Sequence, residues 1–136
     1  MHHTLRVATH GPGLVEITHE VADWLARQSV QDGVLTVFCR HTSASLLIQE
    51  NADLSVQRDL QRFFSNIAPQ TKGLWEHDSE GPDDMPAHVR AALTQTCLSI
   101  PIIDGRMALG TWQGIYVFEH RDTPHKREIV LMFAAA

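Results

Sequence analysis

The last third of the chain places four strand-like segments in succession, with no segment of helix length between them. They span Leu98–Ile103, Arg106–Leu109, Gly114–His120 and Glu128–Phe133. The dipeptide Asp104-Gly105 joins the first two and favours a tight two-residue hairpin turn. Strict alternation of strands and helices, which would indicate a parallel sheet, is absent. This order favours an α+β fold with a largely antiparallel sheet.

The first part of the chain adds two further strands, a helix and a buried strand. Leu5–Thr9 and Leu14–Ile17 alternate apolar and polar residues around a Gly-Pro-Gly sequence, which predicts an opening hairpin. Apolar residues at helical spacing predict an amphipathic helix over Thr18–Gln28. Val34–Cys39 is β-branched and aromatic, as expected of a buried strand.

The middle of the chain predicts a strand, two helices and a long loop. Ser45–Gln49 has strand character, and Asp53–Phe64 has one apolar helical face that Asn51 or Asp53 can cap. Lys72–Asp84 is polar and contains Gly-Pro, so it predicts a loop; loops of this length are more often functional than not. Pro86–Thr96 predicts a third helix, opened by Asp83 or Asp84. We therefore expect residues 1–136 to form a single domain with about three helices.

Composition excludes several classes of function. The net charge is −5 and no basic patch is interleaved with aromatics, so nucleic-acid binding is not expected. No apolar run approaches the roughly 18 residues of a membrane span, and the first residues lack the apolar stretch of a signal peptide. A cytoplasmic protein without membrane contact is expected. Cys39 and Cys97 lie in apolar strands and are expected to be buried free thiols.

Nine histidines make metal binding or proton transfer the chemistry to look for. His41-Thr42-Ser43-Ala44-Ser45 follows a buried strand and offers an imidazole beside hydroxyl groups that can bind an anion. The alternative is a turn whose hydroxyls only satisfy its own backbone.

The richest segment runs from Trp75 to His88 and contains two histidines and five carboxylates. Divalent metals prefer such ligands, and carboxylates commonly orient ligating imidazoles. The spacing matches no standard zinc motif, and a solvated acidic loop before a capped helix is the alternative.

Three shorter segments add polar groups at strand ends. Gln49–Asp53 carries adjacent polar side chains before a helix, where helix capping is the alternative role. Gly110–Gly114 brackets Trp112 and Gln113 with glycines that permit close approach of a ligand, although Trp112 also suits a core or a subunit interface. Arg121 ends a strand and suits phosphate, or a surface ion pair.

These segments, in this order, resemble the YjbQ family, described as secondary thiamine-phosphate synthase enzymes. The matching sequences are HTSASL from His41, ENAD from Glu50, HDSEGPDDMPAH from His77, GTWQGI from Gly110 and EHR from Glu119. The resemblance covers nearly the whole chain. It implies an α+β homotrimer with sites at subunit interfaces, a metal near the matching histidines, and a weak thiamine-phosphate synthase activity.

The matched motifs predict a divalent-metal-dependent enzyme that acts on a small phosphorylated substrate. The expected metal ligands are His41, His77 and His88, with His120 a second choice because the adjacent Arg121 would repel a cation. The expected catalytic residues are Glu50, Glu80, Asp84 and Gln113. The expected substrate-binding residues are Ser43, Ser45, Asn51, Trp112 and Arg121.

Zinc is the first choice of metal, although nickel, manganese and iron also suit such ligands. Two alternatives to an enzyme stay open. One is a non-catalytic binding module for a small anionic metabolite, and the other is a structural trimer with a polar interface.

Overall fold

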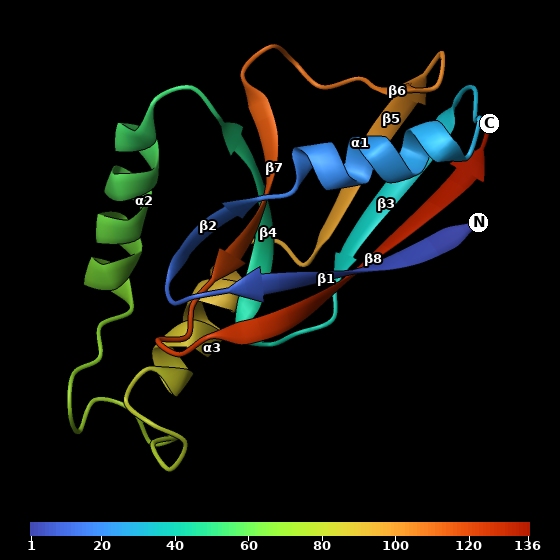
Figure 1. Cartoon of the computed structure of the whole chain (residues 1–136). Helices are drawn as coiled ribbons and strands as arrows, with labels where there is room; N and C mark the ends of the chain where they lie inside the picture. Colours follow the sequence, from blue (N-terminus) through green and yellow to red (C-terminus); the bar gives the residue numbers. More distant parts are fainter.

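Two antiparallel sheets and three helices make up the structure, a computed structural model that describes residues 1–136 (Figure 1). The five-stranded sheet has the order β1 (His2–Thr9), β8 (His125–Ala135), β3 (Gly33–Cys39), β5 (Cys97–Ile103) and β6 (Arg106–Met107). The three-stranded sheet has the order β2 (Gly13–Glu16), β7 (Gln113–Glu119) and β4 (Ala44–Glu50). The helices are α1 (Thr18–Arg27), α2 (Leu54–Ile67) and α3 (Asp84–Leu93). The predicted α+β class with antiparallel sheets is confirmed.

The hairpin between β5 and β6 forms where the sequence predicts it. Ile102 pairs with Met107 and Ile103 pairs with Arg106, which leaves a two-residue turn. Asp104 and Gly105 both have positive φ, 50° and 78°. Positive φ at both central residues is the requirement of a type I′ turn, which Asp-Gly meets at low cost.

The predicted opening hairpin is wrong. β1 pairs with β8 and β2 pairs with β7, so the Gly11-Pro12-Gly13 corner carries the chain from one sheet to the other. β3 and β4 are divided between the sheets in the same way, as are β7 and β8. Alternating apolar residues specify that a strand has one buried face, but they do not specify its partner.

The main core is formed by residues on the inner faces of the two sheets and by residues of α1 that pack against them. β3, β5 and β8 alternate buried and more exposed residues, and their buried positions include Leu35, Ile100 and Leu131, each at most 2% exposed. α1 covers this face with Val21 and Trp24. The helix is one residue shorter than predicted, since Gln28 forms its C-cap.

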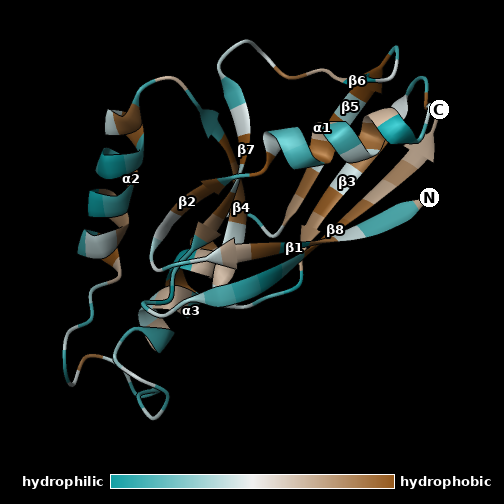
Figure 2. Ribbon diagram, in the orientation of Figure 1, coloured by the Kyte–Doolittle hydropathy of each residue, from teal (hydrophilic) through white to brown (hydrophobic).

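Helix α2 stands beside the outer face of the three-stranded sheet and contacts it through one buried residue, Phe64 (Figures 1 and 2). The Phe64 ring meets the Phe118 ring edge-on, with centroids 5.4 Å apart. Asp53 caps the helix as predicted, because its Oδ1 accepts a hydrogen bond of 2.9 Å from the Ser55 amide. Leu54 and Phe63 stay 65% and 56% exposed, so much of the apolar surface of α2 is uncovered.

The five-stranded sheet also leaves apolar side chains uncovered, on its face away from the core. Val34, Phe38, Ile103 and Met132 are each between 43% and 55% exposed. Cys97 lies on the same strand as Ile103 and is exposed, so the prediction that both cysteines are buried holds for Cys39 alone.

Helix α3 begins at Asp84, two residues earlier than predicted, and ends at Leu93. The long segment between α2 and α3 contains no further helix or strand, as the sequence predicts. It delivers the chain to the end of the three-stranded sheet at which β7 finishes (Figure 1). None of the three helices combines the length and apolar character that crossing a membrane requires.

Candidate functional site

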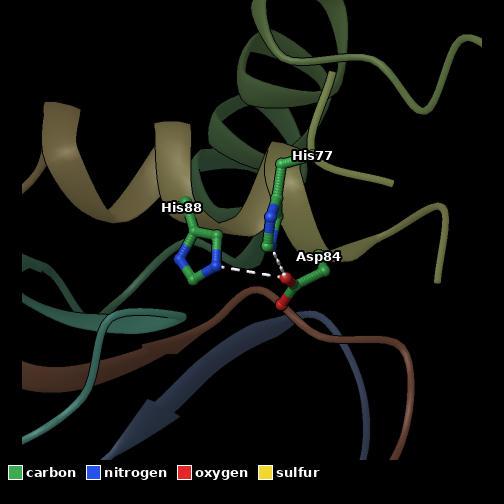
Figure 3. A group of neighbouring side chains, drawn as sticks. All are labelled: His77, Asp84 and His88. Carbon is green, nitrogen blue, oxygen red and sulfur yellow. Dashed lines mark hydrogen bonds and ion pairs between the residues drawn. The ribbon is translucent and has the colours of Figure 1, made fainter. Parts of the chain in front are cut away.

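The loop before α3 and the first turns of α3 bring His77, Asp84 and His88 together (Figure 3). Asp84 is the first residue of α3, and His88 lies one turn later on the same face. His77 reaches the pair from the loop. One ligand atom from each residue lies within 4.8 Å of the others.

Asp84 Oδ2 is the centre of this group. It lies 2.8 Å from His77 Nε2 and 3.1 Å from His88 Nε2. His88 Nδ1 lies 2.9 Å from the Thr42 carbonyl oxygen. Because a carbonyl only accepts, Nδ1 carries the proton in this contact and directs Nε2 towards Asp84.

The other oxygen of Asp84 is held by Arg121. Arg121 Nη1 donates to Asp84 Oδ1 and Arg121 Nε donates to Asp83 Oδ2, both at 2.8 Å, while Nη2 donates to the Glu80 carbonyl. Asp83 also accepts from the Asp122 amide, and although it is the N-cap residue of α3, its side chain makes no capping hydrogen bond. Arg121 therefore joins the end of β7 to the start of α3 and fixes the orientation of the Asp84 carboxylate.

The two carboxylates stay ionised in spite of their burial. Burial raises the pKa of Asp84, but the hydrogen bond from His77 and the charges of His88 and Arg121 outweigh it, so the pKa falls below its ordinary value. The pKa of Asp83 falls for the corresponding reason, since bonds from Arg121 and the Asp122 amide outweigh burial. Asp84 is only 2% exposed, yet it carries a negative charge towards two imidazoles.

This set of donors suits a divalent transition metal. Two imidazole nitrogens and one carboxylate oxygen are ligands that zinc, iron and manganese accept. Two of these side chains are also held through the atom that faces away from the others. His88 Nδ1 is hydrogen-bonded to the Thr42 carbonyl, and Asp84 Oδ1 is hydrogen-bonded to Arg121. Such outer contacts orient ligands at metal sites.

His41 lies outside this group. Its Nε2 accepts a hydrogen bond of 2.8 Å from the Glu128 amide, which occupies that nitrogen's lone pair. Burial and the nearby Arg127 lower the pKa of His41. The structure therefore supplies Asp84 where the sequence predicts His41 beside the other two histidines. The HTSASL segment still reaches the group, through the Thr42 carbonyl.

The predicted anion-binding groups are largely committed to other contacts. Arg121 uses Nε, Nη1 and Nη2 on acidic and carbonyl oxygens. Ser43 Oγ accepts from Arg127, and Ser45 is fully buried against His120 Nε2 at 2.9 Å. Glu80 is exposed, and its carboxylate lies 3.7 Å from His77 Nε2.

Four of the predicted residues form a second group at the opposite end of β4 and β7. Glu50 is the register partner of Gln113, and the Asn51 amide donates to the Trp112 carbonyl at 2.9 Å. The seven residues of β4 span about 20 Å and separate this group from Asp84. Within one chain, the predicted site is therefore divided in two.

A buried ion pair was not foreseen from the sequence. Arg127 Nε donates to Glu119 Oε1 at 2.7 Å, and Glu119 also accepts from Thr9 Oγ1. Arg127 is buried on the same face of β8 as Ile129 and Leu131. Alternate residues of a strand share one face, so the positions of Ile129 and Leu131 could have predicted that Arg127 is buried. The basic sequence His125-Lys126-Arg127 obscured this signal.

Comparisons with known proteins agree with the resemblance in the sequence. The model of the family described as UPF0047 protein YjbQ-like matches residues 3–136. A UPF0047 protein of Synechocystis sp. is 48% identical over 127 residues, which cover 93% of this chain and 86% of the relative. UPF0047 protein YjbQ of Escherichia coli O157:H7 is 41% identical over 93% of this chain and 92% of its own length.

Solved structures extend the agreement to the fold. A YjbQ/UPF0047 protein of Clostridium acetobutylicum aligns with a TM-score of 0.85 at 34% identity, covering 98% of this chain and 99% of the other. A protein of Aeropyrum pernix aligns with a TM-score of 0.90 at 26% identity, covering 100% and 99%. The chain therefore belongs to the YjbQ-like UPF0047 family.

Proposed function

We propose that this chain is a cytoplasmic, divalent-metal-dependent enzyme that acts on a small phosphorylated substrate. The observation that carries the proposal is the convergence of His77, Asp84 and His88 on one point, with the outer atoms of Asp84 and His88 held by other groups. Zinc is the first metal to test.

The chain's own residues have distinct parts in this proposal. A bound divalent ion would polarise a phosphate oxygen and stabilise a leaving phosphate or pyrophosphate. Arg121 keeps Asp84 ionised and correctly turned, and acts as a positioning residue. The exposed carboxylate of Glu80 lies 3.7 Å from His77 Nε2 and would act as the proton acceptor.

The reaction to test first is the one that the family resemblance implies. In thiamine-phosphate formation, the carbon–oxygen bond of a pyrimidine diphosphate breaks and pyrophosphate leaves. The ring nitrogen of a thiazole phosphate forms the new carbon–nitrogen bond. The protein's task is to align the two rings and to stabilise the departing pyrophosphate.

We further propose that three copies of the chain assemble and that each site is shared between neighbours. The exposed apolar residues on α2 and on the outer face of the five-stranded sheet favour burial against another copy. Glu50, Asn51, Trp112 and Gln113 lie too far from Asp84 to serve the same site within one chain. A neighbouring copy would supply them.

Turnover tests this proposal. Protein treated with Zn²⁺ and supplied with both thiamine precursors is expected to release pyrophosphate, and His77→Ala is expected to release at least about a hundredfold less, because it lacks a ligand. His19→Ala, exposed on α1, is the matched control and keeps wild-type turnover. Rescue of thiamine-requiring cells by the wild type, but not by His77→Ala, is the expected result in cells.

Subunit mixing extends the same assay to the shared site. Trp112→Ala and His88→Ala are each expected to be inactive, and reassembling them together is expected to restore part of the activity. Mixed protein that stays inactive, although wild-type protein is active after the same reassembly, contradicts the shared site. Wild-type protein that binds the precursors without turnover supports the alternative, a non-catalytic binding module for an anionic metabolite.

A further inference from the structure

A pocket of about 320 Å³ opens beside His77, and neither its lysine nor its tryptophan belongs to the site described above. The segment between α2 and α3 and the start of α3 line it. Its lining includes Lys72, Trp75, Pro82 and Met85 together with His77 itself. The volume lies in the range of pockets that take small metabolites.

Lys72 is the free cation at this pocket. Arg121 is fully engaged by acidic and carbonyl oxygens, and Arg127 is buried against Glu119. Lys72 makes no ion pair in the structure and is exposed. An unpaired ammonium group binds phosphate oxygens through charge-assisted hydrogen bonds.

Trp75 gives the pocket a fixed aromatic wall. Its indole Nε1 donates to the Pro69 carbonyl at 2.9 Å, which restricts the ring although the loop carries no regular structure. Met85 and Pro82 add apolar surface around it. Indole and thioether groups favour contact with a planar ring. Asp78 also lines the pocket, and its carboxylate would repel a phosphate group placed beside it.

We infer that Lys72 and Trp75 recognise the substrate, Lys72 through a phosphate group and Trp75 through a planar ring attached to it. The ligand class is a small phosphate ester with a planar, apolar group. Lys72 thus takes the phosphate-binding role that the sequence predicts for Arg121, whose guanidinium group is already engaged by other oxygens. The inference rests on the proposed function for the identity of the neighbouring metal site, but the pocket itself can be tested without turnover.

Phenyl phosphate is a suitable probe, since it joins one planar ring to one phosphate. Binding is measured by isothermal titration calorimetry on the intact protein loaded with one equivalent of Zn²⁺, with inorganic phosphate in a parallel titration. Lys72→Met is expected to weaken phenyl phosphate binding about tenfold or more, because it removes a charge-assisted bond and keeps the aliphatic stem. Lys126→Met, the other lysine of the chain, is the matched control and keeps wild-type affinity.

The aromatic wall is tested with a pair of variants. Trp75→Leu is expected to reduce phenyl phosphate binding to the level of inorganic phosphate, and Trp75→Phe is expected to retain most of the difference between the two probes. The inference is overturned if Lys72→Met and Lys126→Met bind alike, or if wild-type protein binds the two probes equally or does not bind phenyl phosphate at millimolar concentration.

A Zn²⁺ titration of the same proteins, beside the phenyl phosphate titrations, separates this inference from the proposed function. If the metal site is wrong, the wild-type protein holds no Zn²⁺, but the difference between Lys72→Met and Lys126→Met persists. If the pocket is wrong, Zn²⁺ is retained and that difference is absent.

Discussion

Replacing Arg127 by methionine is expected to destabilise the folded protein by about 3 to 5 kcal/mol, which is the typical cost of breaking a buried ion pair. Glu119 is fully buried and receives hydrogen bonds from Arg127, Thr9 and the backbone. Burial raises the pKa of Glu119, but the bonds from Arg127 and Thr9 outweigh it, so the carboxylate stays charged. Without Arg127, that charge lacks its main partner.

Urea unfolding at one fixed protein concentration measures the effect. Arg40→Met is the matched control, because Arg40 pairs with Glu128 at 3.2 Å on the surface, and exposed pairs contribute about 0 to 1 kcal/mol. Glu119→Gln combined with Arg127→Met is expected to recover part of the loss, because no uncompensated charge remains. A loss for Arg127→Met as small as that for Arg40→Met would contradict the structural role of the pair.

The stability of the protein is expected to fall between about pH 6.5 and pH 4 because of His120. Burial, with a contribution from Arg90, lowers the pKa of His120 to about 3. In this interval the unfolded chain binds a proton at His120 and the folded protein does not, so acid favours unfolding. The whole shift, from 6.5 to about 3, corresponds to about 5 kcal/mol, of which about 3 kcal/mol is lost between pH 6.5 and pH 4.

The pH interval distinguishes His120 from the buried carboxylates. Asp83, Asp84 and Glu119 have lowered pKa values, so the stability that they contribute is present above about pH 4 and is lost below it. Denaturant titrations from pH 8 to pH 4 with a chelator present avoid interference from metal release. The lowered pKa of His41 also contributes in this interval, so the difference between wild type and His120→Gln is the quantity that reports on His120. His120→Gln is expected to flatten the curve between pH 6.5 and pH 4, and exposed His19→Gln is expected to leave it unchanged. Parallel curves for wild type and His120→Gln would show that the pKa of His120 is the same in the folded and unfolded states, which would contradict this prediction.

The environment of His120 explains why it is buried but unsuitable as a ligand. Its Nε2 contacts Ser45 Oγ, its ring packs on Phe118 with centroids 4.4 Å apart, and its Nδ1 has no hydrogen-bond partner. The EHR motif made His120 the second choice of metal ligand in the sequence analysis. β7 instead directs His120 towards α3 and away from solvent, and only Arg121 reaches Asp84.

Local sequence features predicted the elements of the fold better than their pairing. Helical spacing located α1 and α2, and Asp104-Gly105 located a hairpin with a two-residue turn. Strand partners depended on contacts between distant segments, so the predicted hairpin of β1 and β2 was wrong. No local signal separates a Gly-Pro-Gly hairpin from a corner that links two sheets.

The sequence identified the segments that form the candidate site, but it did not show how these segments are arranged in space. The segment that contains His77, Asp84 and His88 is dense in ligand-type residues, so all three were predicted as site residues. The two histidines were expected as metal ligands, and Asp84 was expected as a catalytic residue. His41 was assigned because its segment follows a buried strand and matches the HTSASL sequence of the family. The Glu128 amide that occupies its Nε2 lies 87 residues away in the sequence. The separation of Trp112 and Gln113 from Asp84 was also invisible in the sequence, since it follows from the length and direction of β4 and β7.

Metal binding by His77, Asp84 and His88 is the central claim, and calorimetric titration of chelator-treated protein with Zn²⁺ tests it most directly. Wild-type protein is expected to bind one Zn²⁺ per chain. His88→Ala and Asp84→Ala are expected to bind at least about a hundredfold more weakly, with unchanged molecular mass in solution, because each removes a direct ligand. His41→Ala is the matched control and keeps wild-type affinity. Loss of binding in His41→Ala with retention in His88→Ala, or no binding by the wild type, would contradict the account.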